Sequence, residues 1–342
     1  MDINDLRAEL KSGNISGVYI LAGEEDYLVR HYLSAIREAM NIDEALAVFN
    51  NPCYEGAEID CPLILEAAKA APMMSDKKLV EWRRADFSNM REGALEEFEE
   101  LVEELKNYPY SAVVFTAGGD GLDFGTPKRP SAFVKRFGGL CKLLRFERSS
   151  DNQLYAWLKK HFESWGVSVG LDTVRALVFR SGHSMSVLAS EVEKLSAMVL
   201  MRGKNTVTPE DVEEIASSTP ECDTFALSNA ILDRNKALAY DALAEMKIRR
   251  VDPTVIMGMI AKTFGELSAV AFLLDDGIGA DRINDTLKMN EYKLKIYLSA
   301  AKRYGPEAIA EILANFTRRD VGSKYGGVTG YTAVELFIAQ NL

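Results

Sequence analysis

The segment Val18-Tyr-Ile-Leu-Ala22 is a short apolar run that ends at Gly23 and is followed by a helical pattern from Tyr27 to Met40. The same alternation continues to residue 147. The further apolar runs are Leu46–Phe49, Leu79–Trp82, Ala112–Thr116 and Leu140–Phe146, and the helical stretches between them are Leu63–Ala71, Gly93–Lys106 and Ser131–Phe137. Buried strands joined by crossover helices are typical of a mostly parallel sheet covered on both faces. We therefore expect an α/β domain over residues 1–147.

The residues that follow show helical patterns without strand signals. Thr208-Pro-Glu-Asp211 is typical of a helix start, because the threonine hydroxyl can accept a hydrogen bond from a backbone amide of the first turn. The polar stretch Ser217-Ser-Thr-Pro220 separates two groups of helices. We expect a small helical domain over residues 148–218 and a second helical domain over residues 219–342. The predicted fold class is α/β followed by all-α.

The composition of the 342-residue chain is that of a folded protein of two or three domains. Hydrophobic residues make up 47% and charged residues 27%, close to the averages for globular domains. No apolar run approaches the roughly 18 residues that span a membrane. Asp2, Asp5 and Glu9 stand where a secretory signal would be basic. The sequence predicts a cytoplasmic protein with no membrane partner.

The net charge of -11 argues against a protein that binds nucleic acid on its own, because phosphate binding depends on Lys and Arg. One local group of basic residues is nevertheless dense enough to touch a phosphate backbone inside a larger assembly. It consists of Lys128, Arg129, Lys135 and Arg136. We treat these four residues as a candidate DNA contact.

The cysteines and histidines lack the spacing of a metal site. They are Cys53, Cys61, Cys141, Cys222, His31, His161 and His183. No two cysteines form a Cys-x-x-Cys pair, and structural zinc sites need four ligands at close spacing. We expect reduced, mostly buried thiols, no bound metal and no cofactor.

A nucleotide-binding α/β domain carries Gly-x-x-x-x-Gly-Lys-Ser/Thr after its first strand, where backbone amides surround the phosphates. At this place the chain reads Ala22-Gly-Glu-Glu-Asp26. Three carboxylates there would repel a triphosphate. The sequence therefore predicts a domain that does not hydrolyse a nucleotide, and we expect no catalytic site.

The segment Ala71-Pro-Met-Met-Ser-Asp76 combines a helix stop with two consecutive methionines. Pro72 ends the preceding helix. Met73 and Met74 then occupy a turn, where two successive side chains do not easily face one core. Methionine is flexible and polarisable, which suits an adaptable binding surface. Two interpretations remain open at this point, docking into a partner's pocket and ordinary core packing.

Several segments together carry a resemblance to a known family. They are Val18–Leu28, Ala71–Val80, Ser186–Leu195, Thr208–Val212, Phe225–Leu232, Ile256–Phe264 and Asp320–Leu342. In order and spacing they resemble the delta subunits of the bacterial DNA polymerase III clamp loader, and the match runs essentially from end to end.

The resemblance implies an AAA+-like domain over residues 1–147 that lacks a phosphate-binding loop, a helical lid over 148–218 and a helical collar over 219–342. The collar would assemble with gamma/tau and delta-prime type subunits into a hetero-pentamer. The protein would bind the sliding clamp ring and help to open it. ATP-driven partner subunits would then load the ring onto primed DNA.

The resemblance also implies roles for single residues. Met73 and Met74, after Pro72, would be an apolar wedge that enters a pocket of the clamp, and Lys77 and Lys78 would lie at the rim of that contact. The commoner pairs in this family are Leu-Phe and Met-Phe, so the methionine at the second place is a departure.

Two other functions remain as alternatives. One is an AAA+-type NTPase with an atypical phosphate loop. The other is a helical DNA-binding regulator that uses residues 281–304, which superficially resemble a helix-turn-helix with Asn290 at the turn.

Overall fold

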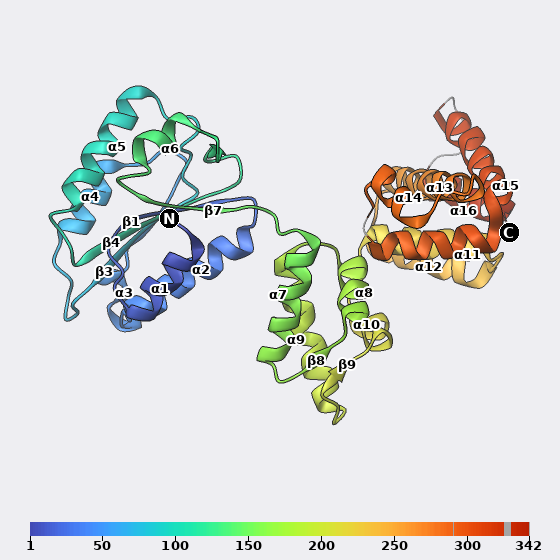
Figure 1. The fold of residues 1–342 in the computed structure, drawn as a ribbon, viewed down its shortest axis with the longest axis horizontal. Helices are drawn as coiled ribbons and strands as arrows, with labels where there is room; N and C mark the ends of the chain where they lie inside the picture. The colour runs from blue at the N-terminus through green and yellow to red at the C-terminus, as the bar shows by residue number, and fades with distance from the viewer. Residues whose placement is uncertain (290, 325–329, 342) are drawn as a thin grey trace. The chain divides into compact units, whose positions relative to one another are not determined.

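The computed structural model describes residues 1–289, 291–324 and 330–341, and it divides into two compact units (Figure 1). Unit 1 is Met1–Ser150 and unit 2 is Asp151–Leu342. Unit 1 is an α/β domain, and unit 2 is almost entirely helical. The predicted fold class is confirmed. The further division of unit 2 at residues 218 and 219 stays a prediction.

Unit 1 is built on a five-stranded sheet in the order β2-β3-β4-β1-β7, and every neighbouring pair is parallel. The strands are β1 (Gly17–Gly23), β2 (Cys53–Glu55), β3 (Lys78–Arg83), β4 (Ser111–Ala117) and β7 (Lys142–Phe146). A small antiparallel hairpin, β5 (Gly125–Thr126) and β6 (Arg129–Pro130), lies outside this sheet. The hairpin has no counterpart in the sequence prediction.

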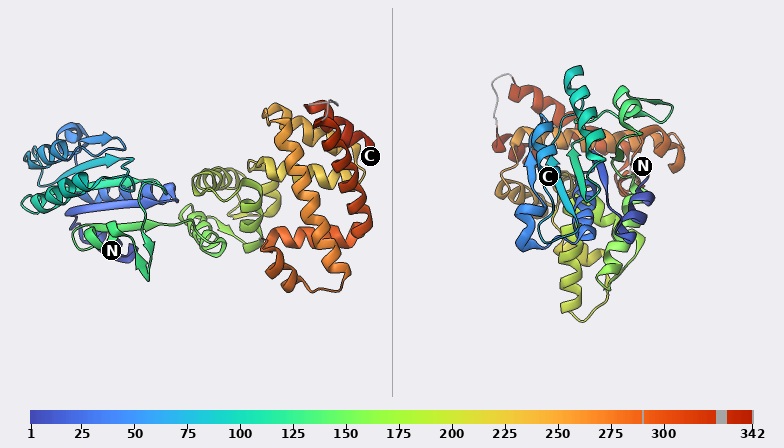
Figure 2. Two further views of the ribbon diagram at one scale, coloured as in Figure 1. Left: turned by 90° about the horizontal axis from the view of Figure 1, so that it is seen from above. Right: turned by 90° about the vertical axis from the view of Figure 1, so that its left-hand side faces the viewer.

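Helices cover both faces of the sheet, as Figures 1 and 2 show. They are α1 (Ile3–Ser12), α2 (Asp26–Met40), α4 (Cys61–Lys69), α5 (Glu92–Leu105) and α6 (Ala132–Phe137). Successive side chains of β1 point to opposite faces of the sheet, so each face has its own apolar core. Val18 and Ile20 join the apolar core that includes α4, α5 and α6, whereas Tyr19 and Leu21 join the core that includes α1 and α2.

The predicted strand Leu46–Phe49 is wrong. This stretch forms a 3₁₀ turn, η1 (Glu44–Leu46), followed by the single-turn helix α3 (Ala47–Asn50), and the edge strand β2 begins only at Cys53. The carboxylate of Asp43 accepts a hydrogen bond from the backbone N–H of Ala45 at 2.9 Å, which favours a turn at this point. The apolar run therefore belongs to a surface turn rather than to the sheet.

Unit 2 consists of ten helices within the described residues. They are α7 (Asp151–Ser164), α8 (Leu171–Ser181), α9 (Met185–Met201), α10 (Pro209–Ile215), α11 (Pro220–Leu232), α12 (Lys236–Ile248), α13 (Pro253–Asp275), α14 (Ala280–Leu287), α15 (Glu291–Lys324) and α16 (Tyr331–Asn341). The predicted capping of α10 is confirmed, because Thr208 and Asp211 form a reciprocal capping box. One short parallel pair, β8 (Ser168–Val169) with β9 (Thr206–Val207), corrects the expectation of helices alone.

Helix α13 is the centre of the larger apolar core of unit 2. Its Ile256, Ile260 and Phe264 are fully buried among residues of α11, α12, α15 and α16. By length and composition α13 is apolar enough to cross a membrane, contrary to the expectation that no segment comes near this limit. Its apolar residues are buried in the core of unit 2, as expected for the core helix of a globular protein.

Candidate functional site

Met73 and Met74 lie on the irregular segment between α4 and β3. Met73 is 45% exposed and Met74 is 88% exposed, and the preceding Pro72 is half-buried. Neither methionine belongs to an apolar core, so the core-packing interpretation does not hold for them. Both apolar side chains are thus accessible to a partner.

The segment leaves α4 at an end that is anchored to the sheet. The hydroxyl of Ser111 donates to the carbonyl of Ala68 at 2.8 Å, and the hydroxyl of Tyr110 donates to the carbonyl of Lys69 at 2.7 Å. The ammonium of Lys78 donates to the carbonyl of Ala70 at 3.1 Å. The last carbonyls of α4, which lack partners inside the helix, are thus bound by residues of β3 and the start of β4.

Asn50 of α3 also binds the segment between α4 and β3, residues 70–77, which we call the wedge segment after its expected role. Its side-chain oxygen accepts the backbone N–H of Met73 at 2.7 Å, and its side-chain N–H donates to the carbonyl of Met73 at 2.8 Å. Asn50 is fully buried, so these two bonds are shielded from water. Nothing in the sequence singles out Asn50, because its role depends on a tertiary contact with the backbone of Met73.

Met74 has an unusual backbone conformation. Its φ angle of 51° lies in the left-handed region, which costs a non-glycine residue roughly 1–2 kcal/mol. This conformation is held by the anchored end of α4, by Asn50 and by the start of β3. The exposed side chain of Met74 is therefore presented by a backbone that the surrounding structure determines.

The buried carboxylate of Glu81 joins β3 to its neighbours. It accepts hydrogen bonds from Arg37 at 2.5 Å and from Arg83 at 3.0 Å, and the side-chain N–H of Asn51 donates to it at 2.9 Å. Burial alone would raise the pKa of Glu81, but the hydrogen bonds from these three residues outweigh it and lower the pKa below its usual value. Glu81 therefore stays charged and holds α2, α3 and β3 together.

Lys77 and Lys78 do not both lie where the resemblance places them. Lys78 is only 4% exposed, and burial lowers the pKa of its ammonium. Lys78 is therefore not a rim residue, since its ammonium is bound to the carbonyl of Ala70 at the end of α4. Lys77 is half-buried, and its ammonium donates to the carbonyl of Gly13.

The candidate DNA contact is divided between two elements. Lys128 and Arg129 lie at the exposed turn and second strand of the β5–β6 hairpin, and Lys135 is exposed on α6. Arg136 is different, because its guanidinium forms ion pairs with Glu92 at 2.6 Å and with Glu99 at 2.7 Å. Lys128, Arg129 and Lys135 therefore present their charge to solvent, whereas that of Arg136 is largely neutralised.

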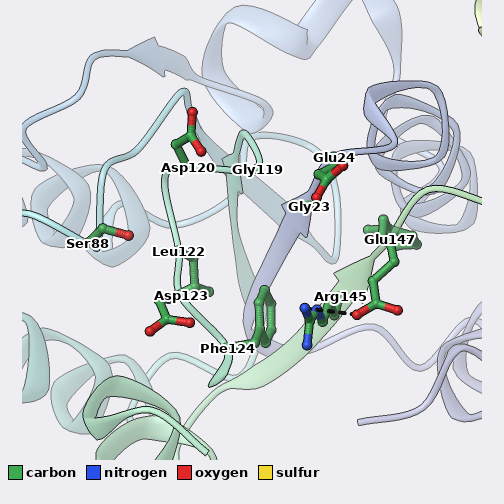
Figure 3. Close-up of a pocket in the computed structure, with 11 residues that line it drawn as sticks. Gly23, Glu24, Ser88, Gly119, Asp120, Leu122, Asp123, Phe124, Arg145 and Glu147 are labelled. Carbon is green, nitrogen blue, oxygen red and sulfur yellow. Dashed lines mark ion pairs between the residues drawn. The ribbon is translucent and has the colours of Figure 1, made fainter. Parts of the chain in front are cut away.

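A pocket of about 290 Å³ lies at the carboxyl ends of the strands, where a parallel α/β sheet commonly binds its ligand (Figure 3). Four carboxylates line it, from Glu24, Asp120, Asp123 and Glu147. Its one basic residue, Arg145, pairs with Glu147 at 2.8 Å. Of the three carboxylates that the sequence places after the first strand, only Glu24 lines the pocket, and the other three lining carboxylates come from later loops and from the residue after β7. A lining of this charge would repel a triphosphate.

The presence of glycine at position 23 is explained by backbone packing, without a bound phosphate. Its φ angle is 149°, and a Cβ atom there would lie 2.1 Å from the carbonyl oxygen of Phe146. The glycine is thus required by the close approach of β7 to the end of β1.

The two buried thiols, Cys61 and Cys141, are unsuited to nucleophilic chemistry. Burial raises the pKa of the Cys61 and Cys141 thiols to about 12, so both stay protonated at neutral pH. Among the described residues, no group of three or more His, Cys, Asp and Glu side chains is arranged to hold a metal ion.

The helices proposed for a DNA-binding regulator are α14 and the first part of α15. Leu294 and Tyr297 of α15 are buried in the core of unit 2. This helix face therefore packs inside the protein and does not read a DNA groove. Asn290, expected at the turn, lies outside the described residues.

Two parts of the chain match models of one known protein family. A family model described as DNA polymerase III, delta subunit, matches residues 19–122, and a second model, for the C-terminal domain of the same delta subunit, matches residues 221–341. The chain belongs to the DNA polymerase III delta subunit family. The first match includes the segment with Met73 and Met74.

Relatives of this delta-family chain match it over most of its length. A DNA polymerase III subunit delta of Bacillus subtilis (strain 168) is 23% identical over 343 residues, with 99% of this chain and 96% of that protein covered. A probable subunit delta of Aquifex aeolicus (strain VF5) is 24% identical, with 90% and 86% covered. The solved Bacillus subtilis DNA clamp loader delta protein superposes with a TM-score of 0.58 at 20% identity, covering 99% of this chain and 98% of that one. The whole chain thus shares the fold of that protein.

Proposed function

We propose that this chain is the delta subunit of a clamp loader and that it binds the sliding clamp through Met73 and Met74. The observation that carries the proposal is the exposure of both methionines on an anchored segment of a delta-family chain. Burial of two such side chains in a partner's pocket offers roughly 1.5–3 kcal/mol each before ordering costs. Because Asn50 and the end of α4 already hold the segment, the ordering cost is small.

The role would be mechanical. The wedge would enter an apolar pocket of the clamp ring, and binding would help to open one interface of the ring. Differential affinity for the open and closed ring is the physical requirement, since a ligand shifts an equilibrium only by that difference. ATP binding and hydrolysis would belong to gamma/tau type partner subunits, in agreement with the acidic pocket of unit 1.

The proposed roles of the other domains are those that the resemblance to the delta family implies. Residues 148–218 would be the lid and residues 219–342 the collar that joins the gamma/tau and delta-prime type subunits in a hetero-pentamer in the cytoplasm. Lys128, Arg129 and Lys135 would approach primed DNA within that complex. The excess of negative charge on the chain supports a DNA contact that is shared with other subunits.

The test is calorimetric titration of the purified chain with the sliding clamp of the same organism. Wild type is compared with a Met73→Ala/Met74→Ala double variant and with Met201→Ala, which removes a methionine that is 83% exposed on α9. We expect the double variant to lose at least about 2 kcal/mol of binding free energy, as hot-spot residues do, and Met201→Ala to bind like wild type. Undiminished binding by the double variant would place the contact elsewhere, and no binding by folded wild type would remove the proposed function.

A further inference from the structure

Most of the exposed large apolar side chains of unit 1, every residue of which is described, belong to two connected segments. Six such residues are exposed there, namely Met1, Val48, Phe49, Leu63, Met73 and Met74. Val48 is 83% exposed and Phe49 is 54% exposed, and both belong to the single-turn helix α3. The residue that follows them, Asn50, is the one that binds the backbone of Met73.

This arrangement connects two surface elements that are distant in sequence. Asn50 spans 23 positions to reach both backbone polar groups of Met73. Asn51 then donates to the carbonyl of Leu79 at 3.0 Å and to the carboxylate of Glu81 at 2.9 Å. Helix α3 is therefore fastened to the wedge segment and to β3 by four side-chain hydrogen bonds, and Val48 and Phe49 are carried on a fixed support.

We propose that α3 is the second half of the docking surface, with Val48 and Phe49 as apolar contacts to the sliding clamp and Asn50 as the residue that positions the wedge. This inference rests on the proposed function. The occupant is the same partner that takes Met73 and Met74, because Asn50 directly follows Val48 and Phe49 and binds the backbone of Met73, so that the two apolar pairs lie on joined segments. Apolar contacts beside a central anchor exclude water from it and strengthen binding.

The positioning role of Asn50 differs from that of the contact residues. Its carboxamide is fully buried and its hydrogen bonds go to the backbone of Met73, so it acts on the partner only through the wedge. A change at Asn50 should weaken binding when the methionines are present. The same change should have no further effect once both methionines are alanine, because residues that act through one another are not additive.

The experiment uses the full chain and the sliding clamp in the same calorimetric titration. A Val48→Ser/Phe49→Ser variant is expected to bind about tenfold more weakly than wild type, with an unchanged thermal unfolding midpoint. The matched control is Ile248→Ser, which replaces a residue of α12 that is 75% exposed and should leave the affinity unchanged. Asn50→Ala is measured in the wild-type and in the Met73→Ala/Met74→Ala backgrounds, and it should weaken binding only in the first.

The outcomes separate this inference from the proposed function. If the methionine variant loses binding while the Val48/Phe49 variant binds like wild type, the clamp contact of Met73 and Met74 is supported and the role of α3 is overturned. If Asn50→Ala costs the same affinity in both backgrounds, its positioning role is overturned. If folded wild type does not bind the clamp, both proposals fail. Sedimentation of the chain alone provides a last check, because self-association that the Val48/Phe49 variant abolishes would assign the surface to a second copy of the chain instead.

Discussion

The carboxamide of Asn50 and the backbone of Met73 form two hydrogen bonds, of 2.7 Å and 2.8 Å, in a part of the molecule where Asn50 is fully buried and Met73 is half exposed. One buried side chain thus determines the conformation of an exposed apolar segment. The energetic consequence can be measured without any partner.

Asn50→Ala should lower the free energy of unfolding by about 1–3 kcal/mol, because it removes both bonds and leaves the backbone groups of Met73 without their buried partner. Urea titration followed by circular dichroism measures this change. Asn107→Ala serves as a control, since the side chain of Asn107 makes only an exposed bond of 3.3 Å to Glu104. Equal stability of Asn50→Ala and wild type would show that the segment is not held in this way.

Met74→Gly should separate stability from binding. Glycine adopts a φ angle of 51° without strain, so the free energy of unfolding should stay the same or rise by about 1 kcal/mol. Clamp affinity should fall at the same time, because the wedge side chain is gone. Met73→Gly is the matched comparison, since Met73 has no positive φ and gains no relief of strain. A clear loss of stability in Met74→Gly would contradict the left-handed conformation.

Glu81 should contribute stability that depends on pH. Its folded-state pKa is lowered by its hydrogen bonds from Arg37, Asn51 and Arg83, so its contribution is fully present above the unfolded value of about 4.5 and is lost as the pH falls through the lower, folded value. Glu81→Gln should therefore cost about 1–3 kcal/mol at pH 7, and the difference from wild type should shrink below pH 4.5.

The control for this pH series is Glu55→Gln. Glu55 pairs with Arg84 at 2.8 Å, but both side chains are more than half exposed, and exposed pairs contribute little. Its stability difference from wild type should be small at every pH. A Glu81→Gln difference that stays constant from about pH 7 to about pH 3, across the range where the carboxylate should protonate, would show that Glu81 is not the group that titrates.

Nucleotide should not stabilise the chain. A ligand at 100 times its dissociation constant adds about 2.7 kcal/mol to the free energy of unfolding, which is readily seen as a shift of the melting temperature. We expect no shift with millimolar ATP and Mg²⁺, because four carboxylates line the pocket at the strand ends. An increase of several degrees would favour the alternative of an atypical NTPase.

The layered fold could be predicted because its signals are local. Val18–Ala22, Leu79–Trp82 and Ala112–Thr116 are largely apolar, as strands buried on both faces must be, and the structure confirms each of them. Leu46–Phe49 has a similar composition but forms a 3₁₀ turn and the short helix α3 instead of a strand. Whether such a run is buried depends on its position in the sheet, and here the edge strand starts only at Cys53.

The candidate site was predicted less completely than the fold. Met73 and Met74 stand out because a proline and two methionines on a turn are unusual in sequence, but only the family resemblance gave them a role. Asn50 could not, since its role depends on a tertiary contact with a backbone that leaves no trace in residue type. Lys78 was misplaced for a similar reason, because only the packing of α4 on β3 buries its ammonium.

Photo-cross-linking from position 74 can show whether Met73 and Met74 contact the clamp. A photoreactive amino acid replaces Met74 in one preparation and Met201 in another, and each is irradiated with the sliding clamp under binding conditions. We predict a cross-link from position 74 to residues that line an apolar pocket of the clamp, and none from position 201. Efficient cross-linking from position 201 with none from position 74 would contradict the claim that Met73 and Met74 form the contact with the clamp.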